Sequence, residues 1–154
     1  MGKLAFKATE LAISLLNKTS KSTVQIHGTE NIGEGPVLFV SNHFTRLETG
    51  LIPWAVYQNT GRVARSLADE ALFKGPLGSF LNSVGVFSTG DDTYKNTLIQ
   101  DLATGSNDWV IYPEGGMIKN KITVNEQGKL WLPAPWRKGP PRTGAASFAI
   151  MGEA

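Results

Sequence analysis

The chain has 154 residues, a length typical of one domain with its own core. Hydrophobic residues make up 41% and charged residues 18%, which excludes a disordered or fibrous protein. A net charge of +2 argues against a nucleic-acid partner, and the lack of cysteine excludes disulfides, thiolate metal sites and a thiol nucleophile. No apolar run approaches the roughly 20 residues that span a bilayer, and the N-terminus shows no signal peptide.

Residues 1–22 are predicted to form an N-terminal amphipathic helix, ahead of a domain over residues 23–154. The apolar residues of this helix recur at helical spacing, with lysines around them. They are Leu4, Phe6, Ala8, Leu11, Ala12, Ile13, Leu15 and Leu16. Such a helix either packs on the domain or lies at an anionic lipid surface. This segment alone favours packing, because the helix is short and has no tryptophan.

The rest of the chain alternates predicted strands and helices. Strands are expected at residues 23–27, 37–40, 63–67, 84–88 and 109–112, and helical segments at 47–58, 72–81 and 94–103. The run at 37–40 is expected to be a buried strand, and Gly105 is expected to end the last helix. This alternation indicates an α/β fold with a mostly parallel sheet flanked by helices. Residues 119–142 are expected to form a long loop, with a hairpin as one option.

Two polar loops follow predicted strands, Ser41-Asn42-His43 and Pro113-Glu114-Gly115. Parallel sheets carry their chemistry at such strand ends. Glu48 lies five residues beyond His43, and T-R-L-E from Thr45 to Glu48 matches a helix capping box. Glu48 therefore either bonds the main-chain N–H of Thr45, with Thr45 as the N-cap, or orients the ring of His43 as in a catalytic triad. Spacing alone favours the cap.

No enzyme nucleophile is recognisable, because the chain has no G-x-S-x-G elbow. We therefore expect His43 to act as a general base on a hydroxyl of the substrate, in direct acyl or phosphoryl transfer. His27 lies on a different segment, and neither an H-x-x-x-H nor a D-x-D pair is present. The sequence thus predicts no metal site.

Four stretches, in order, resemble the glycerolipid (lysophospholipid) acyltransferase superfamily, whose typical member acylates glycerol 3-phosphate or lysophosphatidic acid. N-H-F-T-R-L-E at 42–48 is similar to the first block, N-H-x-x-x-x-D/E, and V-I-Y-P-E-G-G at 110–116 to the third. Residues 68–87 resemble the approach to the second block, and R-T-G-A-A-S-F-A at 142–149 the helix after the third. The fourth block is missing, so we expect a chain truncated at its C-terminus and an incomplete glycerol-3-phosphate acyltransferase-like fold.

The resemblance implies an O-acyltransferase of phospholipid biosynthesis and lipid metabolism. It would move a fatty acyl group from an acyl-CoA or acyl carrier protein thioester to a hydroxyl of a glycerolipid-like acceptor, with no further cofactor. His43 would be the general base and Glu48 its support. The residues implied to bind substrate are Asn42, Arg46, Glu114, Gly115 and Gly116.

Two arginines that the resemblance leads one to expect are missing. The second block continues into Ser88-Thr89-Gly90, and Gly116-Met117 follow the third-block glutamate and glycine where Thr and Arg are usual. Either Lys119 and Lys121 or Arg62 and Arg65 would supply the charge instead, and otherwise the acceptor is not a simple glycerol phosphate. The missing arginines leave open a non-catalytic lipid-binding relative, and a hydrolase that uses His43 to activate water is a third alternative.

Trp131 and Trp136 lie among prolines and cations. Such a segment either lies at a membrane interface or covers an edge of the core. Because the resemblance implies lipid substrates, it favours peripheral association of this loop and of the N-terminal helix with the cytoplasmic face of a membrane.

Overall fold

The computed structural model describes residues 3–20, 23, 25–43, 45, 47–117, 126–129, 132–134, 137–140 and 142–153. Its elements in chain order are α1 (Lys3–Ser20), η1 (Thr29–Asn31), β1 (Leu38–Val40), α2 (Glu48–Thr60), β2 (Ala64–Ala68), η2 (Glu70–Phe73), α3 (Gly75–Ser83), β3 (Val86–Ser88), α4 (Thr93–Thr104), β4 (Asp108–Ile111), β5 (Leu132–Ala134), β6 (Arg137–Gly139) and α5 (Gly144–Glu153).

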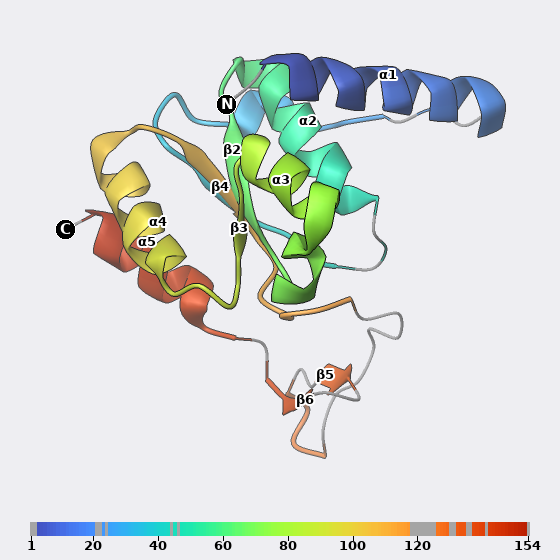
Figure 1. Ribbon diagram of the computed structural model, residues 1–154. Coiled ribbons are helices and arrows are strands. Elements are labelled where there is room, and N and C mark those ends of the chain that lie inside the picture. Colours follow the sequence, from blue (N-terminus) through green and yellow to red (C-terminus); the bar gives the residue numbers. More distant parts are fainter. Residues whose placement is uncertain are drawn as a thin grey trace.

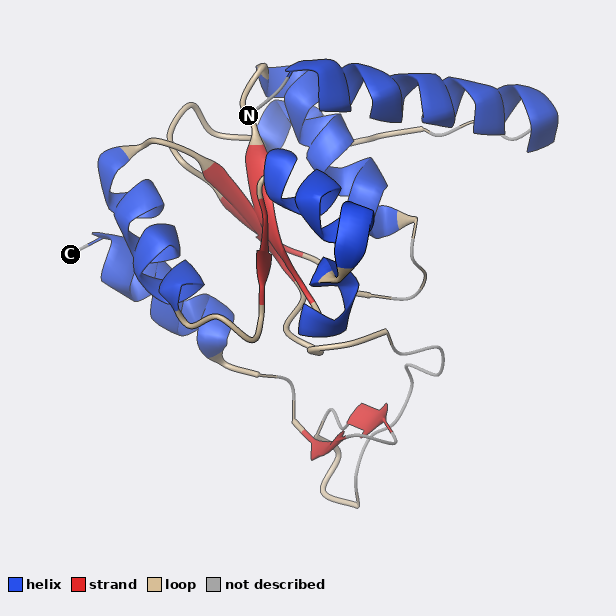
Figure 2. Ribbon diagram, viewed as in Figure 1, coloured by secondary structure: helices blue, strands red, loops and turns tan. Residues whose placement is uncertain are grey.

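Three parallel strand pairings build one four-stranded sheet in the order β1-β4-β2-β3. Helices α2 and α3 cover one face, and α4 and α5 lie together on the other (Figure 1). Figure 2 shows the sheet edge-on between these two helical layers, with the small β5–β6 hairpin away from it. The predicted fold class, α/β with a mostly parallel sheet flanked by helices, is confirmed.

Strand β4 is the centre of the core, since all of its residues are buried. Val110 packs towards α2 against Val56 and Ala64. Trp109 and Ile111 pack on the opposite face, in the cluster that includes Leu98 of α4. A strand covered by helices on both faces has a continuous apolar run in its sequence, and such a run at residues 109–112 predicted this strand.

Two buried acids engage the arginines near the N-terminal ends of the strands. Asp108 accepts the main-chain N–H of Val37 at 2.9 Å and pairs with Nε of Arg62 at 2.9 Å. Asp101 pairs with Arg65 at 2.9 Å. The expectation that Arg62 and Arg65 supply charge to the polar loops is therefore wrong, because both are held by acids towards the other end of the sheet.

Two strand predictions need correction. Residues 23 and 25–27 form no strand, and they pair with no strand of the described chain. Residues 25–27 are exposed, so their main-chain groups do not need the hydrogen bonds of a sheet. The strand at 37–40 forms, but it lies at the edge of the sheet rather than inside it, and Val40 is 55% exposed. The residue range 119–142 contains the hairpin, while Trp131 and Trp136 lie outside the described residues.

Helix α1 packs on α2 by a narrow face, with Ile13 only 7% exposed. Two leucines of the predicted apolar stripe point elsewhere, since Leu11 and Leu15 are 64% and 54% exposed. Among the helices in the described part of the chain, none is long and apolar enough to cross a membrane.

Candidate active site

The pairing of β1 with β4 brings the two polar loops together. The strands run in register, with Val40 opposite Ile111. Three residues further along each strand, the main-chain N–H of His43 donates a 2.8 Å hydrogen bond to Oε2 of Glu114. The same offset of 71 residues joins Val37 to Asp108 at the other end of the pair. The Glu114 carboxylate thus continues the ladder beyond the strands and fixes the backbone of His43.

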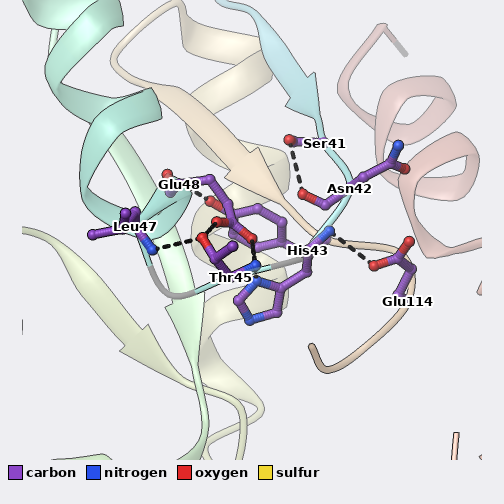
Figure 3. Close-up of polar contacts among 8 residues, drawn as sticks. Ser41, Asn42, His43, Thr45, Leu47, Glu48 and Glu114 are labelled. Atoms are coloured by element: carbon purple, nitrogen blue, oxygen red, sulfur yellow. Dashed lines mark hydrogen bonds and ion pairs between the residues drawn. The ribbon is translucent and has the colours of Figure 1, made fainter. Parts of the chain in front are cut away.

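The structure brings His43 and Glu48 into contact, as Figure 3 shows. Nδ1 of His43 lies 2.9 Å from Oε1 of Glu48, and the two side chains are 18% and 14% exposed. Nε2 has no hydrogen-bond partner among the residues that the structure describes. One ring nitrogen is therefore held by a carboxylate, and the other remains for a ligand.

Glu48 also makes the capping contacts, so the two alternatives for it occur together. Its Oε1 accepts the main-chain N–H of Thr45 at 2.8 Å, and its other carboxylate oxygen bonds the Thr45 hydroxyl. That hydroxyl in turn accepts the N–H of Leu47 at 3.1 Å. The helix begins at Glu48, with Leu47 at the N-cap, so Thr45 is not the N-cap residue.

These contacts determine the charge of the Glu48 carboxyl. Burial acts to raise its pKa, but hydrogen bonds from the Thr45 hydroxyl, from His43 and from the main-chain N–H groups of Glu48 and Thr45 outweigh it. The pKa of Glu48 falls from 4.5 to about 2. The carboxylate beside His43 is therefore ionised at neutral pH.

Tyr112 supports both members of the pair, and the sequence analysis missed it. Its ring lies 4.8 Å from the ring of His43, centre to centre, and its hydroxyl donates to the main-chain oxygen of Glu48 at 3.2 Å. Burial, followed by the negative charge of Glu48, raises the pKa of the Tyr112 hydroxyl, which keeps it a donor. The sequence did contain a signal for Tyr112, because alternation along the strand places its side chain on the same face of the sheet as Val110.

The residues that the resemblance implied to bind substrate differ in their exposure and in their contacts. Asn42 is exposed, and its side chain points away from the His43 ring (Figure 3). Glu114 is buried and holds the His43 backbone, while Gly115 and Gly116 form the turn that follows it. Arg46, like the cations Lys119 and Lys121, falls outside the described residues.

An apolar cavity of about 280 Å³ lies between α2, α3 and β2. Its β2 wall carries three small side chains at alternate positions, Ala64, Ser66 and Ala68, together with Leu67. Tyr112 and Thr49, the residue after Glu48, also line it. The cavity therefore extends from the sheet interior to the side of the His43–Glu48 pair.

One histidine held by one ionised carboxylate suits proton transfer at a bound hydroxyl. Within the described ranges, no group of three or more histidine, aspartate or glutamate side chains is arranged to hold a metal ion.

A protein-family model described as "Acyltransferase" matches residues 23–153 of the chain. The match includes the loop of His43, the third-block loop at Glu114 and helix α5. No curated protein and no solved structure matches the chain.

Proposed function

Because the chain belongs to the acyltransferase family of the glycerolipid type, we propose that it moves a fatty acyl group from a thioester to a hydroxyl of a glycerolipid-like acceptor. The donor in this proposal is acyl-CoA or acyl carrier protein, and the acceptor is lysophosphatidic acid or a related lysolipid. The single observation that carries the proposal is the 2.9 Å contact between Nδ1 of His43 and the Glu48 carboxylate.

His43 is the proposed general base. Nε2 takes the proton of the acceptor hydroxyl as its oxygen attacks the thioester carbon, and the ionised Glu48 stabilises the resulting imidazolium. The tetrahedral intermediate then collapses, the C–S bond breaks, and the imidazolium returns the proton to the departing thiolate. A thioester is already activated, so no covalent enzyme intermediate is required.

The apolar cavity beside the pair is the proposed site of the fatty acyl chain. Because Thr49 and Tyr112 line the cavity, an acyl chain that lies along the small residues of β2 would place its thioester carbon near His43. Burial of methylene groups there stabilises the complex by about 0.8 kcal/mol each.

The exposed stripe of α1 supports peripheral association with the cytoplasmic face of a membrane. Lys7, Leu11, Leu15 and Lys18 are all exposed and recur at helical spacing, so they share one face. Leucines flanked by lysines suit an interface in which the apolar groups enter the lipid and the cations meet anionic headgroups.

The test is thiol release from a long-chain acyl-CoA, and from acyl carrier protein, in the presence of liposomes and a panel of lysolipid acceptors. His43→Ala should lower acceptor-dependent release by about 100- to 10,000-fold, the usual contribution of a general base. The chain offers a matched control in its other histidine, the exposed His27, and His27→Ala should keep the wild-type rate.

Equal rates for wild type and His43→Ala would exclude the role given to His43. Fatty acid released without any acceptor would instead favour a hydrolase. Binding of lysolipid with no turnover by a folded wild-type protein would favour the lipid-binding alternative.

A further inference from the structure

Arg142 lies against Pro113 and Gly115, the two residues that flank Glu114, which holds the backbone of His43. Its main-chain N–H donates to the carbonyl of Pro113 at 3.1 Å, which brings the segment before α5 beside the loop. A methyl group on Gly115 would lie 3.0 Å from Nε and 3.3 Å from Cζ of Arg142. The guanidinium therefore occupies the space that any side chain at Gly115 would need.

The backbone of Gly115 allows this approach. Its φ angle of +71° lies in the left-handed region, which side chains rarely adopt, and its missing Cβ leaves room for the guanidinium. The close packing of Arg142 on the loop is thus built into the conformation of the turn.

The charge of Arg142 is not used within the described protein. Its side chain makes no ion pair and no hydrogen bond there, and the residue is exposed. By contrast, Arg62 and Arg65 are each held by an aspartate near the other end of the sheet. Among the described residues, Arg142 is therefore a cation without a side-chain partner, next to the loop whose Glu114 holds His43.

We propose that Arg142 binds the negatively charged group of the acyl acceptor, in the place of the two arginines that the chain lacks. This inference rests on the proposed function, since it identifies the acceptor as one that carries a phosphate. The planar guanidinium presents two parallel N–H donors that match a phosphate, and Gly115 holds it on the loop that also positions His43. A phosphate at Arg142 would orient the acceptor hydroxyl towards Nε2.

The kinetic test compares lysophosphatidic acid with a monoacylglycerol of the same chain, which lacks the phosphate. Arg142→Gln should raise KM for lysophosphatidic acid about 10- to 100-fold and leave KM for the monoacylglycerol unchanged, because one charge-assisted contact is lost. Arg142→Lys should lie between the two. Lys95→Gln removes one positive charge from α4, where Lys95 pairs with Asp92, and should change neither value.

Gly115→Ala provides a second variant that keeps Arg142 itself unchanged. The added methyl would displace the guanidinium, so the same acceptor-selective rise in KM is expected. Equal loss with both acceptors in the two variants, at unchanged thermal stability, would overturn the proposal, as would unchanged KM values for both acceptors in Arg142→Gln.

A binding measurement separates this inference from the catalytic proposal. Glycerol 3-phosphate and inorganic phosphate would be titrated by calorimetry into His43→Ala and into His43→Ala/Arg142→Gln. Binding that the second substitution weakens supports the anion site even if no acceptor is ever acylated. Weakening for both ions shows that the phosphate group suffices, and weakening for glycerol 3-phosphate alone shows that a lipid-type headgroup is required. Equal binding to the two proteins would overturn the site while leaving acyl transfer standing.

Discussion

Oε1 of Glu48 lies 2.9 Å from Nδ1 of His43 and accepts the main-chain N–H of Thr45 with the same oxygen. One carboxylate thus orients the ring and also closes the turn that leads into α2. Its charge matters for the imidazolium, whereas its shape and acceptor oxygens matter for the turn, so substitution can separate the two contributions.

Glu48→Gln should keep the turn and lose the charge. The amide oxygen can still accept from Thr45, so the turn is retained, although thermal stability at neutral pH should fall because the stabilising ionised carboxylate is lost. Acyl transfer should fall about 10- to 1,000-fold, because the imidazolium loses its anionic partner. Glu48→Ala removes both contributions and should lower stability as well as rate. A Gln variant with wild-type kcat would show that Glu48 only caps the helix.

The depressed pKa of Glu48 predicts a pH dependence of stability. A group with a lowered folded-state pKa stabilises the fold above its ordinary pKa of 4.5, and that contribution is lost as the pH falls towards about 2. Urea midpoints measured between pH 6 and about 2.5 should therefore decline more steeply for wild type than for Glu48→Gln. Parallel curves would show that the carboxylate gains nothing from these hydrogen bonds.

Tyr112 supports the pair through its ring and through its hydroxyl. Tyr112→Phe removes the bond to the Glu48 carbonyl and should destabilise the fold by about 1 kcal/mol, the net value of one hydrogen bond. Because the ring still packs on His43, kcat should change little. Tyr112→Ala also removes the ring and should cost about 2–4 kcal/mol and much of the activity. Equal effects of the two substitutions would show that the hydroxyl, not the ring, is what positions His43.

Gly78 permits the close contact between η2 and α3. A Cβ there would clash with the carbonyl oxygen of Phe73, which is backbone and cannot rotate away. Gly78→Ala should therefore cost at least about 2–3 kcal/mol in urea denaturation. Gly33→Ala is the matched control, since no atom lies within 4 Å of its Cβ position, and it should stay within about 0.5 kcal/mol.

Local patterns predicted the elements of the sheet well, because a strand covered on both faces and a helix ended by glycine have signatures in the sequence. Strand β4 and helix α4, which Gly105 ends with φ +72°, are examples. The same patterns failed at residues 23–27, since an alternating segment becomes a strand only beside a partner.

The site was predictable in its members but not in all of its contacts. The two loops followed from the strand ends, whereas spacing alone favoured the helix cap for Glu48 and the family resemblance implied the His43–Glu48 pair. The bond from His43 to Glu114 depends on the register of two strands 71 residues apart, and no local pattern reports a register. The capture of Arg62 by Asp108, 46 residues away, was hidden for the same reason.

The register of β1 and β4 also determines where the chain can tolerate insertions and deletions. Segments 37–43 and 108–114 run side by side with equal lengths. They are joined at one end by the hydrogen bond from Val37 to Asp108 and at the other by the hydrogen bond from His43 to Glu114. One residue added to or removed from segment 37–43 would turn His43 to the opposite face, and the same change in segment 108–114 would turn Glu114, so either change would separate the two residues. The surface loops that join the other elements, away from the turn between His43 and Glu48, carry no such constraint, so insertions and deletions in related chains should collect there and spare both segments.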